Sequence, residues 1–183
     1  MRKKVELDKY DNSWYNPGPR WKIIIWLLIN IFIFKSSLPF PQFLKIKLLK
    51  MFGCKLGKNV LIKPNVNIKY PWFLDIGNDV WIGEEVWIDN LAHISIGSNV
   101  CISQGAMLLC GNHNYKKTGF DLIVKPITIE NGVWIGAQAI VCPGVIIRSH
   151  AILSVGSIAS KNLNSYKIYK GNPAEEVNNR ILS

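Results

Sequence analysis

The most regular feature of the chain is an aliphatic residue that returns every six positions. The series runs through Leu56, Ile62, Ile68, Leu74, Ile76, Ile82, Ile88, Ile94, Ile96, Ile102 and Leu108, and then Ile127, Ile129, Ile135, Val141, Ile147, Leu153 and Ala159. A helix repeats its apolar face every 3.6 residues and a half-buried strand every two, so neither explains this period. We therefore predict a solenoid, in which three six-residue sides close a coil of about 18 residues. The alternative, a β-sandwich, would show two-residue alternation with irregular spacing.

The repeat slips by two residues at three places, Leu74-Asp75-Ile76, Ile94-Ser95-Ile96 and Ile127-Thr128-Ile129. The first two slips lie 20 residues apart, whereas the third follows after 33. The surplus predicts a protruding loop over residues 114–126, where a polar stretch interrupts the hexads. Small residues such as Gly77 and Gly136 follow many of the aliphatic positions, which suits tight corners.

The pattern divides the chain into three parts. Residues 1–55 precede the repeats and form a basic, aromatic and helical segment. Residues 56–163 carry the solenoid with its protruding loop, and residues 164–183 are expected to form a turn and a short helix.

The N-terminal part also carries most of the charge. Of the net charge of +10, residues 1–60 contribute +9. Within them, the apolar run at residues 23–34 predicts one helix, and a second is expected from about Gln42 to Phe52. The run is shorter than the roughly 20 residues that span a bilayer, and no small-residue cleavage site follows it. We expect neither a spanning helix nor a signal peptide.

Two compatible roles are open for this segment. It can cover one end of the solenoid, or it can contact anionic lipid with the help of Lys35, Lys45, Lys47 and Lys50. Nucleic acid is a less favoured partner, because no reader fold is visible. Four cysteines without metal or disulfide spacing indicate reduced thiols and a cytoplasmic protein, at the inner face of the cell membrane if the segment binds lipid.

Ordered motifs along the repeats resemble those of a known family. They include Cys101-Ile102-Ser103-Gln104, Gly111-Asn112-His113-Asn114-Tyr115, Trp134-Ile135-Gly136-Ala137 and Gly171-Asn172-Pro173-Ala174. With them the chain resembles the hexapeptide-repeat acyltransferases, and among these the colanic-acid-type polysaccharide O-acetyltransferases. The resemblance implies an all-β solenoid, the left-handed parallel β-helix, assembled as a homotrimer with active sites between adjacent prisms. It also implies direct transfer from acetyl-CoA in a ternary complex.

The resemblance and the positions of polar residues along the coils together indicate which residues form the site. His113 is expected to be the general base, since an imidazole can take the proton of a sugar hydroxyl as the oxygen attacks a thioester. An extended groove for acetyl-CoA is expected from Trp134, Gly136, Ala137, Gly156, Ser157, Lys161 and Arg180. The acceptor is expected to contact polar residues that stack beside His113, namely Asp89, Asn90, Ser103, Gln104, Asn112 and Tyr115.

Two alternative chemistries could use histidine or cysteine residues near this site. His93 lies 20 residues before His113, so the two should stack about 4.8 Å apart on one face. The γ-class carbonic anhydrases share this fold and bind zinc through three histidines, but His150 does not fall on that stack, and no metal is expected. Cys110 could be an acylated nucleophile, but a structural role is preferred because the family transfers directly.

The sequence as a whole predicts an acetyl-CoA-dependent O-acetyltransferase that acts on a sugar or a lipid-linked glycan in surface polysaccharide or exopolysaccharide biosynthesis. An acyltransferase acting on an amino sugar or on serine would share nearly every feature. A non-catalytic β-helix scaffold at the membrane is the other alternative, against which His113 and Trp134 argue.

Overall fold

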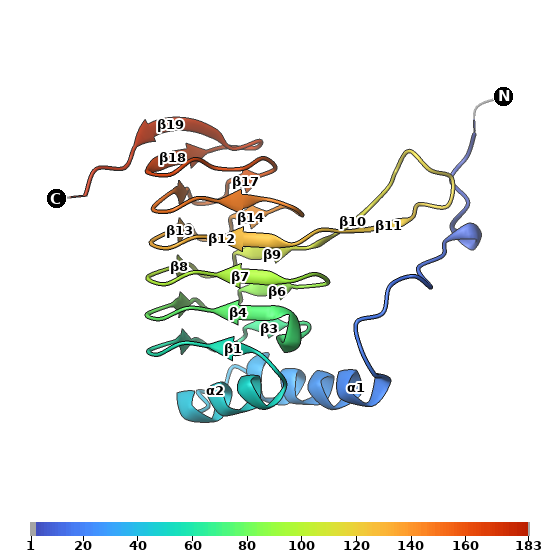
Figure 1. The fold of residues 1–183 in the computed structure, drawn as a ribbon, viewed down its shortest axis with the longest axis horizontal. Coiled ribbons are helices and arrows are strands. Elements are labelled where there is room, and N and C mark those ends of the chain that lie inside the picture. The colour runs from blue at the N-terminus through green and yellow to red at the C-terminus, as the bar shows by residue number, and fades with distance from the viewer. Residues whose placement is uncertain (1–2, 183) are drawn as a thin grey trace.

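The computed structural model describes residues 3–182 and shows a three-sided parallel β-helix with two helices across one end (Figure 1). One side stacks β1 (Lys55–Leu56), β4 (Leu74–Ile76), β7 (Ile94–Ile96), β12 (Ile127–Ile129) and β15 (Ile146–Ile147). The second stacks β2 (Leu61–Ile62), β5 (Trp81–Ile82), β8 (Cys101–Ile102), β13 (Trp134–Ile135), β16 (Ile152–Leu153), β18 (Lys167–Lys170) and β19 (Glu175–Asn179). The third stacks β3 (Asn67–Ile68), β6 (Trp87–Asp89), β9 (Met107–Leu109), β14 (Ile140–Val141) and β17 (Ile158–Ala159).

The parallel pairing stacks equivalent residues of successive coils directly on one another. On the second side, Ile62 pairs with Ile82, Ile82 with Ile102, Ile102 with Ile135, and Ile135 with Leu153. All five side chains are fully buried. The predicted six-residue repeat and three-sided coil are therefore confirmed.

Each side contributes a second inward residue that the six-residue count did not single out. It lies two positions before the large aliphatic and is a valine or alanine in most coils: Val60, Val66, Val80, Val86, Val100, Ala106, Val133, Ala139, Val145 and Ala151. Three sides that each point a large side chain inward leave room only for small ones beside it. The interior is thus a close-packed apolar column.

The corners use two different devices. The third residue after the large aliphatic has a positive φ, as at Asn65 (58°), Asp79 (57°) and Gly105 (68°). The glycine directly after the aliphatic has another purpose, because a Cβ on Gly77 would lie 2.7 Å from the carbonyl carbon of Gly97 in the next coil. These glycines allow successive corners to stack closely.

The predicted excursion is an antiparallel hairpin of β10 (Gly111–His113) and β11 (Leu122–Val124). Figure 1 shows it projecting from the prism. The rungs close beneath it, because Ile94 of β7 pairs with Ile127 of β12 across the 33-residue interval. We expected a loop over 114–126, but the excursion starts earlier, since its backbone groups pair with one another across the hairpin.

The expected short C-terminal helix is wrong. β18 continues the second side, with Ile168 paired to Ile152 and Tyr169 to Leu153, and β19 folds back antiparallel on β18. The unpaired backbone groups of β16 at the open end of the solenoid are satisfied by a further strand. The division of the chain into three domains stays a prediction.

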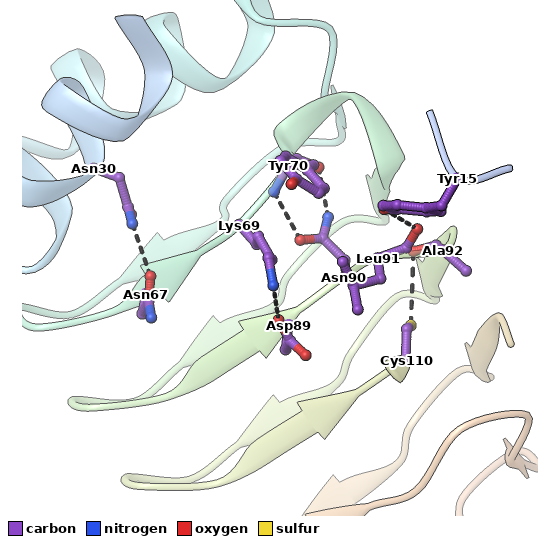
Figure 2. Close-up of polar contacts among 10 residues, drawn as sticks. All are labelled: Tyr15, Asn30, Asn67, Lys69, Tyr70, Asp89, Asn90, Leu91, Ala92 and Cys110. Atoms are coloured by element: carbon purple, nitrogen blue, oxygen red, sulfur yellow. Dashed lines mark hydrogen bonds and ion pairs between the residues drawn. The ribbon is translucent and has the colours of Figure 1, made fainter. Parts of the chain in front are cut away.

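The N-terminal helices cap the other end, as expected. α1 (Arg20–Ile29) continues through the π-helical η2 (Asn30–Phe34), and α2 (Gln42–Met51) follows. Trp26 Nε1 donates to the Ile68 carbonyl at 2.8 Å, and the Asn30 side chain donates to Asn67 at 2.7 Å (Figure 2). Nowhere in residues 3–182 does a helix reach the length and apolarity needed to cross a bilayer.

Lys45 does not serve the lipid contact suggested for it. Its side chain is buried, and Nζ donates to the carbonyls of Ile62 and Lys63 at 3.0 and 3.1 Å. Burial lowers the pKa of this ammonium group. Lys45 therefore holds α2 against the first coil.

Candidate functional site

His113 ends strand β10 of the hairpin and is held by two contacts from Phe120, which lies in the hairpin turn before β11. Its Nδ1 lies 2.9 Å from the carbonyl oxygen of Phe120, and its ring stacks on the Phe120 ring with centroids 4.5 Å apart and planes 9° apart. Because a carbonyl oxygen only accepts, Nδ1 must carry the proton. The Nε2 lone pair is left available to accept a proton.

His113 lines a cleft of about 630 Å³ between the hairpin and the outside of the prism. Asp89 and Asn112, two of the expected acceptor residues, line the same cleft. Asn112 also accepts a hydrogen bond from the His113 backbone N–H at 2.8 Å. The structure thus brings the expected base together with part of the expected acceptor set.

The opposite wall of this cleft comes from the N-terminal segment, which sequence reasoning did not assign to the site. Residues 3–19, with the short 3-10 helix η1 (Leu7–Lys9), run from the end cap to the hairpin, where Glu6 N donates to Thr118 O at 2.9 Å. Tyr10 lies with its ring centroid 5.7 Å from that of His113. Tyr15 donates its hydroxyl proton to Leu91 O at 2.7 Å, and burial raises its pKa.

The floor of the cleft is a small polar network (Figure 2). Lys69 Nζ lies 2.9 Å from Asp89 Oδ1, and the carboxylate side chain is only 14% exposed. The Asn90 side chain accepts from Tyr70 N at 2.9 Å and donates to Tyr70 O at 2.5 Å. Asn90 was expected to bind the acceptor, but it is fully buried and both ends of its amide are used, so it positions Tyr70 instead.

A second groove of about 530 Å³ lies on the second side of the prism. Three of the expected donor residues, Trp134, Gly136 and Ala137, line it together with Ser103 and Gln104. Trp134 Nε1 donates to Ser103 Oγ at 2.9 Å. Ser103 and Gln104 were expected beside His113, but they directly follow β8, which stacks on β13 on the second side of the prism.

The remaining expected site residues lie outside both clefts. Gly156 adjoins the groove, since its N–H donates to Ala137 O at 2.8 Å, and Lys161 is an exposed corner residue. Ser157 is buried because it occupies the small inward position of its coil, and its hydroxyl accepts from Gly171 N. Arg180 donates to the carbonyls of Gly132 and His150 at 2.7 and 3.3 Å.

Tyr115, an expected acceptor residue, is exposed near the hairpin tip, away from the cleft lining.

The expected stacking of His93 with His113 is wrong. His93 directly precedes β7, its carbonyl accepts from Ile127 N, and its Nε2 lies 3.2 Å from Asp75 Oδ2. The residues that lead into β12 therefore stack next to His93 in the following coil. His113 does not, because the hairpin starts at Gly111 and carries His113 away from the β-helix. Across residues 3–182, no three His, Cys, Asp or Glu side chains are grouped to hold a metal ion.

Cys110 is poorly suited to nucleophilic catalysis. Its thiol is fully buried and donates weakly to Ala92 O at 3.6 Å (Figure 2). Burial raises its pKa to about 11, so only a minute fraction is thiolate near neutral pH. This buried environment supports the structural role that the sequence favours for Cys110.

Comparison of this sequence with known proteins finds related acetyltransferases. The chain is 34% identical over 170 residues to the putative colanic acid biosynthesis acetyltransferase WcaF of Escherichia coli K12, covering 91% of this chain and 92% of the relative. It is 30% identical over 140 residues to the galactoside O-acetyltransferase of the same organism, covering 73% and 68%. No protein-family model matches.

A solved structure shows the same fold. It is that of the hexapeptide-repeat-containing acetyltransferase VCA0836 of Vibrio cholerae in complex with acetyl coenzyme A, with a TM-score of 0.76 at 21% identity over 87% of this chain and 86% of that one. The fold and the relatives together define an acyltransferase of the parallel β-helix class. This chain belongs to the hexapeptide-repeat acetyltransferases that include the colanic acid acetyltransferase WcaF.

Proposed function

We propose that this protein transfers the acetyl group of acetyl-CoA to a sugar hydroxyl of a surface or exported polysaccharide, with His113 as general base. The observation that carries the proposal is the anchored imidazole. The Phe120 carbonyl fixes the proton on Nδ1, so the base on Nε2 is ready in an open polar cleft. The sugar acceptor is supported by two relatives, a galactoside O-acetyltransferase and a putative colanic acid biosynthesis acetyltransferase, and by the polar residues around His113.

The proposed transfer proceeds directly, without an acyl-enzyme. Nε2 takes the hydroxyl proton as the sugar oxygen attacks the thioester carbon, which gives a tetrahedral intermediate. The intermediate collapses by breaking the carbon–sulfur bond, and the imidazolium returns the proton to the departing CoA thiolate. Asp89 and Asn112 orient the acceptor by hydrogen bonds to its other hydroxyls, which is where such positioning gains rate.

Acetyl-CoA is proposed to lie in the groove lined by Trp134, Gly136 and Ala137. A flat aromatic side chain and two small residues suit a long, narrow pantetheine arm lying against the backbone. Lys161, which is exposed one coil further on, is the proposed phosphate contact. Acetyl coenzyme A is the ligand of the VCA0836 structure, which supports this donor.

The assembly is proposed to be a cyclic homotrimer. Among residues 3–182, the His113 cleft and the Trp134 groove have no lining residue in common. A neighbouring copy that presents its groove to the His113 cleft would complete the site. Because all four cysteines are free, the reducing cytoplasm is the proposed location.

Release of free CoA thiol from acetyl-CoA in the presence of a galactoside tests the proposal, with product analysis to separate O- from N-acetylation. We expect His113→Ala to lower kcat/KM about 10²- to 10⁴-fold, the usual contribution of a general base. His93→Ala is the matched control and should keep wild-type activity, because His93 pairs with Asp75 away from the cleft. A His113→Ala variant as active as this control would refute the assignment.

A further inference from the structure

A distinct surface of the molecule is the outer side of the end-cap helices. We call it the end-cap face and define it by the exposed apolar side chains Trp21, Ile24, Ile25, Leu27, Leu28, Ile31, Phe32, Phe43 and Met51. Monomeric proteins rarely leave such a contiguous apolar surface uncovered. In Figure 1 these helices lie across the end of the prism, so their outer side faces away from the coils.

The α1–η2 helix is apolar on both of its faces. Trp26, Asn30 and Phe34, each four residues apart, are buried against the first coil. Ile24, Leu28 and Phe32 are offset from these by two positions, about 200° around a helix, and are 57%, 50% and 69% exposed. A helix that is apolar all round is typically covered on every side by protein or lipid. Among residues 3–182, this chain covers one side of the helix.

The charge around this face indicates what covers the other side. From Asn12 to Leu74 the sequence holds ten Lys or Arg residues and neither Asp nor Glu. Lys35, Lys47 and Lys50 are exposed on the end cap itself. Two copies pairing through this face would bring like charges together, whereas a surface of anionic lipid is complementary to it.

We propose that the end-cap face docks on the surface of an anionic lipid bilayer. The apolar side chains would enter the boundary between head groups and acyl chains, and the lysines would meet the lipid phosphates. The 15 residues from Arg20 to Phe34 lie along the end of the prism, which suits a helix lying in the interface rather than one crossing it.

A cavity connects this face with the site. It measures about 290 Å³, and Ile23, Leu27 and Ile31 form its helical wall. Its other wall includes Lys69 and Asp89, which also line the His113 cleft. Figure 2 shows this ion pair between Asn30 of the end cap and Tyr15 of the N-terminal segment. The two hollows therefore adjoin at the Lys69–Asp89 pair.

Together with the proposed function, docking on a bilayer indicates that the acceptor is a lipid-linked sugar. A sugar joined through phosphate to a lipid would reach His113 from the bilayer, with its apolar part beside α1 and its phosphate near Lys69. The acceptor would then be membrane-borne, and docking would hold the enzyme on the surface where that acceptor is found.

Vesicle co-sedimentation of the full chain tests the docking itself. We expect binding to vesicles of phosphatidylcholine mixed with phosphatidylglycerol, weaker binding to phosphatidylcholine alone, and loss of binding on adding salt. The triple variant Ile24→Glu, Leu28→Glu, Phe32→Glu should bind at least tenfold more weakly. The matched control Val177→Glu, Ile181→Glu alters exposed apolar residues at the opposite end of the chain and should bind like wild type.

Equal binding of the triple variant and wild type, or equal binding to the two kinds of vesicle, would overturn the proposal. So would a change of molecular mass in sedimentation velocity for the triple variant alone, because that would make the face a protein interface. Acetyl transfer to a small water-soluble glycoside is measured in parallel and should be the same in wild type and triple variant. Its absence in wild type would count against the proposed function while leaving the docking result in place.

Discussion

The orientation of the His113 imidazole depends on one neighbouring residue. Phe120 supplies both the carbonyl that accepts from Nδ1 and the ring that stacks on the imidazole. Its φ of 53° lies in the left-handed region, which costs a residue with a side chain about 1 kcal/mol or more. The contacts to His113 and the hairpin turn offset that cost, so Phe120 is a positioning residue for the proposed base.

Replacing Phe120 by alanine removes the stack and keeps the carbonyl. We expect Phe120→Ala to lower kcat about tenfold with little change in the KM for acetyl-CoA, because a loosened base is misplaced while the donor groove is untouched. Phe120→Tyr keeps the ring and should restore the rate. Nitrogen NMR of the imidazole should show the proton on Nδ1 in both wild type and Phe120→Ala, because the backbone carbonyl that accepts it remains. An unchanged kcat in Phe120→Ala would contradict this role.

Sequence reasoning reached His113 but not its surroundings. The Gly-Asn-His-Asn-Tyr motif carried the resemblance, whereas Phe120, Tyr10 and Tyr15 belong to segments without periodicity. Tyr15 meets Leu91 across 76 positions of sequence, and no local pattern marks such a contact. The same limit placed Ser103 beside His113, since a linear motif does not tell which side of the prism a strand occupies.

At the scale of the element, the corners decide how closely coils stack. A Cβ on Gly57, Gly77, Gly83, Gly97 or Gly136 would lie under 3.0 Å from atoms of the next coil, whereas the positive-φ position holds Asn, Asp, Glu, Gln, His or Gly. The two positions are chemically different even though both carry glycine in this chain.

The difference can be measured by thermal unfolding. Gly77→Ala should lower the stability by about 2 kcal/mol, because its Cβ would meet Gly97 and Ser98 backbone at 2.7 and 2.8 Å and the coil must shift. That corresponds to a drop in Tm of about 4–8 °C for a chain of this size. Gly105→Asn is the matched control and should stay close to wild type, since asparagine already holds the equivalent corner at Asn65. A reversed order of the two variants would contradict this account.

The elements themselves were predictable wherever the period held. When the inward residue recurs every six positions, only one register buries that residue in every coil. The pairing of the strands could therefore be predicted from the spacing alone. Residues 164–183 have no such period, and β18 and β19 form because the last coil leaves an edge to be paired. That information lies in the neighbouring strand and not in the segment.

At the scale of the whole molecule, the proposed base and the proposed donor groove lie in two separate hollows of one chain. If adjacent copies complete each other, inactive variants should complement. Co-expression of His113→Ala with Ala137→Trp, which fills the donor groove, should restore about a quarter of the activity, the share of boundaries where an intact cleft meets an intact groove. Each variant alone should be inactive. Failure to recover activity from confirmed mixed assemblies would mean that each chain works by itself.

Ile94 pairs directly with Ile127 beneath the hairpin, so the core of the β-helix does not depend on the hairpin residues. Because the core closes without them, residues 111–124 can lengthen, shorten or be replaced by a graft from a relative while the scaffold persists. Under the proposed function, an exchanged hairpin that retains His113 would change the acceptor without rebuilding the β-helix, and protein engineers can use the same exchange.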